Sequence, residues 1–102
     1  MSRTAVHNCN LNIRYDLPDE QWKKIAELYT KMPGWIGYLE GIPHWFGEED
    51  DEVTISASVE PSGLLLYARM ESGDWEKWLE SFKTQAAEAL GYPIGEPEDG
   101  FL

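Results

Sequence analysis

Lysine and arginine are missing from 37 consecutive residues of this chain, Met32 to Ala68, a stretch that contains seven carboxylates. The formal net charge of the whole chain is -11, and it is distributed unevenly. Residues 1–35 carry five basic and four acidic side chains, whereas residues 36–102 carry three basic and fifteen acidic ones. Proteins that bind nucleic acid or an anionic membrane carry charge of the opposite sign. The sequence therefore argues against both partners and favours a strongly basic one.

Cysteine is almost absent as well, because Cys9 is the single one. No disulfide can form within the chain, and nothing indicates an oxidising compartment. The first twenty residues include Arg3, His7 and Arg14 and lack the apolar stretch of a secretory signal. No apolar run approaches the roughly 18 residues that a membrane-spanning helix requires. A soluble cytoplasmic protein is the expectation.

Recognisable catalytic and metal-binding motifs are missing too. The chain has no nucleophile elbow, glycine-rich phosphate loop, zinc-protease motif or pair of closely spaced cysteines. Cys9 is expected to be a buried, unreactive thiol, and His44, between Pro43 and Trp45, a surface or rim residue without a catalytic role. The acidic run lacks the spacing and central glycine of a calcium loop. The sequence thus predicts no enzyme activity, no cofactor and no metal site.

What the chain does contain is enough apolar and aromatic material for one folded domain: 42% of its residues are hydrophobic and 13% aromatic. Residues 8–15 alternate between apolar and polar side chains, which predicts a strand. Helical spacing of apolar residues predicts helices at about 18–32 and 74–90, each ended by a glycine. The helix at 74–90 and the one before it should bury Trp22, Trp75 and Trp78. Residues 35–46 suit one bulged or edge strand interrupted by glycine and proline.

A hairpin over residues 53–70 is the best-defined element. Glu60-Pro61-Ser62-Gly63 has the residues of a type I turn, and the turn fixes which residues lie opposite one another. Val59 should face Leu64, and Ala57 should face Leu66. A shift by one residue would mix the apolar and polar faces.

The order strand-helix-strand-strand-strand-helix predicts an α+β fold, in which two helices cover one face of a mainly antiparallel four-stranded sheet. Residues 1–91 should form a single domain, and residues 92–102 an extended acidic tail. The open face of the sheet should show Asn8, Asn10 and Asn12 together with Tyr67. This face suits solvent and a docking partner equally well.

Two aromatic side chains stand directly before the acidic run. Strand alternation places Trp45 and Phe46 on opposite faces, so at least one of them should lie outside the core. Aromatic side chains surrounded by charge are typical of tight protein interfaces. The predicted partner-binding residues are therefore Trp45, Phe46, Glu48, Glu49, Asp50, Asp51 and Glu52.

In size, acidity, aromatic content and lack of catalytic groups, carried by the stretch from Trp45 to Glu52, the chain resembles the small acidic immunity proteins that neutralise bacterial nuclease toxins. The resemblance implies an inhibitor that occludes the basic active site of a toxin. Two alternatives remain open. One is a phage-type DNA mimic that inhibits a defence nuclease, and the other is a small-molecule-binding or enzymatic domain that uses the open face of the sheet.

Overall fold

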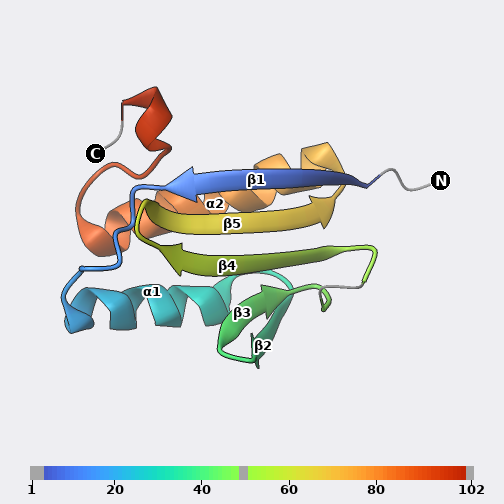
Figure 1. Ribbon diagram of the computed structural model, residues 1–102, viewed down its shortest axis with the longest axis horizontal. Coiled ribbons are helices and arrows are strands. Elements are labelled where there is room, and N and C mark those ends of the chain that lie inside the picture. The colour runs from blue at the N-terminus through green and yellow to red at the C-terminus, as the bar shows by residue number, and fades with distance from the viewer. Residues whose placement is uncertain (1–3, 49–50, 101–102) are drawn as a thin grey trace.

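The computed structural model describes residues 4–48 and 51–100. The chain forms an α+β domain with a five-stranded antiparallel sheet, in the strand order β1-β5-β4-β3-β2, and two helices (Figure 1). The strands are β1 (Ala5–Leu11), β2 (Trp35–Leu39), β3 (Ile42–Trp45), β4 (Thr54–Glu60) and β5 (Gly63–Met70). The helices are α1 (Asp19–Lys31) and α2 (Ser72–Leu90), and a 3-10 turn spans Pro97–Asp99. The predicted fold class and both helices are confirmed.

The hairpin of β4 and β5 has the predicted register. Val59 lies opposite Leu64, and Ala57 opposite Leu66. The face that carries Ile55, Leu66 and Ala68 is fully buried in the core together with apolar side chains of both helices. Trp75 and Trp78 belong to this core as expected, while Trp22 is half-buried at its margin. Only the end of the hairpin departs from the pattern, because Val59 is exposed.

The sheet has one strand more than the four predicted. Residues 35–46 form two strands that pair with each other, joined by Glu40 and Gly41. Both turn residues have positive φ, 52° and 82°, as a two-residue hairpin turn of type I′ requires. The glycine that looked like an interruption of one strand is therefore the turn between two.

Strand β1 ends earlier than the alternation predicted. Its last paired residue is Leu11, and the backbone N–H of Asn12 then donates to the carbonyl of Gly95. The predicted faces of two of the last positions are consequently wrong, because Asn12 is buried and Tyr15 is exposed, while Ile13 is buried as predicted. The chain beyond the predicted domain boundary contributes to the core, because Ile94 is buried within it.

Candidate partner-binding surface

The acidic loop, defined here as residues 46–53, connects the end of β3 to the start of the neighbouring strand β4 (Figure 1). Of the predicted binding residues, Phe46, Glu48, Asp51 and Glu52 are exposed. Glu49 and Asp50 lie outside the described residues. Glu48 and Asp51 form no ion pair with a lysine or arginine of the described chain, whose recorded ion pairs, Arg14–Asp16 and Lys83–Glu80, lie elsewhere. Their negative charge is therefore available to a partner.

Hydrogen bonds hold the described part of this loop in one shape. The Thr54 hydroxyl donates to the carbonyl of Gly47 at 2.8 Å, and the backbone N–H of Glu48 donates to Asp51 Oδ2 at 2.8 Å. Arg69, from the open face of β5, donates more weakly to the Asp51 carbonyl at 3.4 Å. Loop residues that are already held by hydrogen bonds lose less conformational entropy when a partner binds.

Phe46 occupies an unusual backbone conformation, with φ of 70°. For a non-glycine residue such a conformation costs on the order of 1–3 kcal/mol and persists only where surrounding contacts enforce it. Here the N–H of Phe46 donates to the Gly34 carbonyl at 2.7 Å. A Cβ on residue 34 would lie 2.6 Å from a ring carbon of Phe46, so the ring packs on a position that only glycine can occupy. The side chain is nevertheless 44% exposed.

Trp45 points the other way and is fully buried. Its Nε1 donates to the Tyr29 carbonyl at 2.9 Å, and its ring contacts Tyr29 and Trp78 edge-on. The alternative left open by the sequence is thereby resolved: Phe46 is the exposed ring. Trp45 cannot touch a partner in this conformation.

An apolar groove of about 490 Å³ lies on the helix side of the acidic loop. Apolar lining comes from Pro33, Phe46, Val53, Met70 and Trp78. Asp74 and Lys77 supply charge to the same lining. The exposed ring of Phe46 therefore borders a groove that can accept an apolar side chain next to the carboxylates.

A polar pocket of about 510 Å³ lies on the other side of the loop, against the open face of the sheet. Its lining includes Tyr38, Glu40, His44, Glu48 and Asp51. The prediction that His44 lies at the surface or rim was wrong, since the residue is 2% exposed. His44 pairs with Ser56 in the sheet and lies beside the acidic loop, which explains its burial. Sequence reasoning missed the pocket, because the turn that brings Glu40 there was not recognised.

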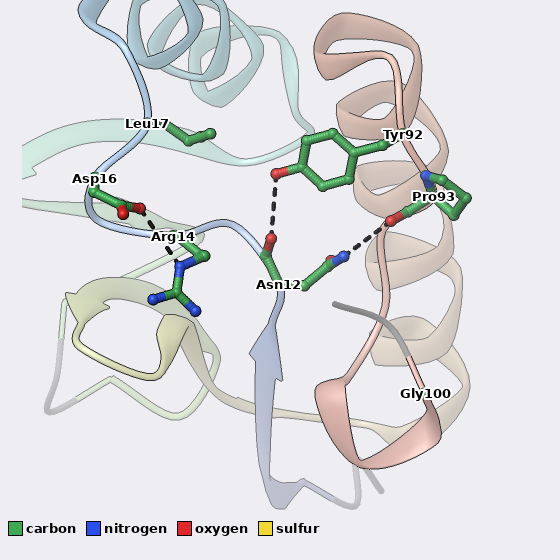
Figure 2. Close-up of a pocket in the computed structure, with 7 residues that line it drawn as sticks. All are labelled: Asn12, Arg14, Asp16, Leu17, Tyr92, Pro93 and Gly100. Carbon is green, nitrogen blue, oxygen red and sulfur yellow. Dashed lines mark hydrogen bonds and ion pairs between the residues drawn. The ribbon is translucent and has the colours of Figure 1, made fainter.

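The asparagine row predicted for the open face is incomplete. Asn12 is buried, its Nδ2 donates to the Pro93 carbonyl at 3.0 Å, and its Oδ1 accepts from the N–H of Gly95 at 3.0 Å. Figure 2 shows the Tyr92 hydroxyl pointing to the Asn12 carbonyl and the Asn12 amide to Pro93. These groups and the Arg14–Asp16 ion pair line a pocket of about 520 Å³. Most of the polar groups in this lining are already bonded to other residues of the chain. The side chain of Asn12 thus binds the backbone of the C-terminal segment at Pro93 and Gly95. Of the three asparagines predicted for the open face, Asn8 and Asn10 remain there.

Cys9 is buried, and its thiol pKa is raised from 9.0 to about 12. Burial is the main cause, and the Glu96 carboxylate, which accepts a hydrogen bond from the thiol, adds to it. A thiol in this state is a poor nucleophile. No group of three or more His, Cys, Asp or Glu side chains that could hold a metal ion occurs within residues 4–48 and 51–100.

The raised pKa of Cys9 predicts how stability depends on pH. Above pH 9.0 the unfolded chain loses a thiol proton that the folded chain keeps until about pH 12. The free energy of unfolding should therefore fall as pH rises in this range, by up to about 1.4 kcal/mol per pH unit. Urea denaturation on either side of pH 9.0 measures the slope. Burial also raises the pKa of Tyr29 and Tyr92, so some slope should remain in Cys9→Ala, but an equally steep slope would contradict this assignment.

No helix of the described chain is long and apolar enough to cross a membrane. No protein family, curated protein or solved structure matches the chain.

Proposed function

We propose that this chain is an acidic inhibitor of the immunity-protein type, which binds a basic toxin and occludes its active site. The toxin is a nuclease in this proposal, and the inhibitor acts in the cytoplasm without catalytic activity of its own. The observation that carries the proposal is an exposed aromatic ring, Phe46, held in a strained conformation beside the exposed carboxylates of Glu48 and Asp51.

The charge of the loop fits this target. A nuclease active site is positively charged because it binds phosphates. Carboxylates can occupy the positions of those phosphates, and their field accelerates the encounter above the ordinary rate of about 10⁵–10⁶ M⁻¹s⁻¹. The exposed Glu48 and Asp51 are available for this role because they form no ion pair in the described chain.

The strain at Phe46 fits the same function. Backbone strain of this kind concentrates at functional sites, where it holds a side chain in the binding geometry. An exposed ring contributes little to folding, whereas a ring that enters a partner's pocket can dominate the binding energy. The apolar groove next to Phe46 gives the partner room to surround the ring.

Protection of growth tests the proposal. The chain is co-expressed in turn with the products of the genes that flank its own, and wild-type protein should restore growth against the one that is toxic. Failure to protect against, and to bind, that toxin would contradict the proposed function.

The five carboxylates of residues 48–52 should mainly control the association rate. Changing Glu48, Glu49, Asp50, Asp51 and Glu52 to the matching amides should slow association with the purified toxin about 10- to 100-fold at low salt and flatten its salt dependence. The amide that replaces the Asp51 carboxylate keeps an oxygen that can accept the Glu48 N–H, so the fold should survive. Stopped-flow fluorescence measures the rate.

A matched control removes five exposed charges elsewhere, changing Glu20, Glu27, Glu76, Glu80 and Glu88 to Gln. This variant has the same net charge as the loop variant but should associate much faster. Equal rates for the two variants would show that overall charge, rather than the acidic loop, guides the partner.

A further inference from the structure

The polar pocket next to His44 has a composition that selects a cation. Three of its lining residues are exposed carboxylates, Glu40, Glu48 and Asp51, and its described lining contains no lysine or arginine. Arg69 contacts the nearby Asp51 carbonyl but is not part of the lining. Carboxylates that line one pocket make its electrostatic potential negative, which attracts a cation.

A second, independent feature comes from His44 itself. Its Nδ1 lies 2.8 Å from the Ile42 carbonyl. A carbonyl oxygen only accepts, so Nδ1 carries the proton and, in the neutral ring, Nε2 presents its lone pair. Nε2 is buried and has no hydrogen-bond partner among the described residues. His44 is the buried member of a lining whose carboxylates are exposed, so its ring forms part of the pocket wall behind them. A donor that reaches Nε2 would satisfy this buried acceptor.

Size and shape favour an organic cation over a metal ion. The pocket is roomy, about 510 Å³, and its acidic residues do not form a group that could hold a metal among the described residues. The exposed ring of Tyr38 adds an aromatic surface to the lining. A planar guanidinium stacks on such a ring and has five donors in a fixed fork, whereas an ammonium is a compact charge with three.

We propose that this pocket binds the guanidinium group of an arginine side chain. The inference deepens the proposed function, on which it rests for the source of the arginine: the basic partner inserts this residue on one side of the acidic loop while Phe46 contacts the partner on the other. The partner then contacts the acidic loop on both of its sides.

The pocket can be tested without any partner. The probe is N-acetyl-L-arginine amide, compared with the lysine analogue and with the neutral citrulline analogue, which has nearly the shape of arginine. NMR spectra of the His44 ring nitrogens and the Tyr38 ring report binding. The arginine probe should shift both sets of signals with a Kd on the order of 1 mM. The lysine probe should bind at least about threefold more weakly, and citrulline should cause no saturable shift.

Two variants locate the site. The double change Glu40→Gln and Glu48→Gln removes two exposed charges without disturbing the core and should weaken binding of the arginine probe about tenfold or more. Tyr38→Leu should reduce the difference between arginine and lysine. The control Glu60→Gln, on the far end of β4, should leave both affinities unchanged.

Several results would overturn the proposal. Equal affinities for arginine and lysine would indicate an unselective acidic surface, and shifts of the His44 nitrogens by micromolar Zn²⁺ or Ca²⁺ that exclude the arginine probe would indicate a metal site. Failure of this inference is distinguishable from failure of the proposed function. If the toxin binds the chain but the arginine probe does not, only the assignment of the pocket fails. If the probe binds but the chain gives no protection from the toxin, only the proposed function fails.

Discussion

Replacing Trp45 by alanine should lower the free energy of unfolding by about 3–5 kcal/mol, the usual range for removing a large buried aromatic side chain. The Trp45 ring is fully buried among Tyr29, Trp35 and Trp78. Its loss would also leave the Tyr29 carbonyl without the indole donor that it now has at 2.9 Å. Since domains of this size are stable by only about 5–15 kcal/mol, the effect is a large share of the total. Urea denaturation followed by far-UV circular dichroism measures it.

Trp22→Ala is the matched control, because it removes the same side chain from the margin of the core. Trp22 is half-buried, and its indole bond to the Tyr15 carbonyl is long, at 3.4 Å. The control should lose less than half as much stability. Similar losses at the two positions would mean that Trp45 is not the centre of the aromatic core.

Replacing the adjacent Phe46 by asparagine should instead have a large effect on binding and a small effect on the free energy of unfolding. Dissociation from the proposed toxin should become about 30- to 1000-fold faster, the effect of losing roughly 2–4 kcal/mol at an interface hot spot. The free energy of unfolding should stay within about 1 kcal/mol of wild type, because asparagine tolerates positive φ and the relief of strain offsets the lost contacts with Gly34. Surface plasmon resonance and urea denaturation give the two quantities.

The variant Phe46→Ala separates the effect of backbone strain at position 46 from the effect of the contacts that the ring makes. It removes the ring but keeps a residue that disfavours positive φ, so it should be less stable than Phe46→Asn while dissociating equally fast. If Phe46→Asn loses as much stability as Trp45→Ala, the ring belongs to the core and the hot-spot assignment fails.

The sequence predicted best where two local signals agreed. The register of the β4–β5 hairpin followed because the turn at Pro61-Ser62 and the alternation of apolar residues required the same pairing. The stripe of Trp75, Trp78 and Phe82 on α2 was long enough to define one buried helix face. In both elements the contacts that decide the structure lie close together in sequence.

Prediction failed where distant contacts decide. Asn12 looked like a third member of an exposed row, but its amide is bound by residues 93 and 95. His44 looked like a rim residue next to a proline, but it faces Ser56 within the sheet and lies beside a loop that is later in the chain. For the acidic surface, the sequence identified the charged loop and the need for one exposed ring. It could not identify Phe46 as that ring, because the choice depends on the positive φ of Phe46 and on the packing of its ring against Gly34.

The pairing of β1 with β5 has a consequence for how the protein is made. Ala5 lies opposite Met70, so the first strand has no partner in the sheet until β5 has been synthesised. Ile94, which completes the core, comes later still. The β4–β5 hairpin can form early because its strands are adjacent in sequence. Pairing of β1 with β5, in contrast, costs the conformational entropy of closing a long loop. On the ribosome, β1 therefore waits with its apolar face uncovered until β5 has been made, and the core of the domain is complete only after Ile94 has followed.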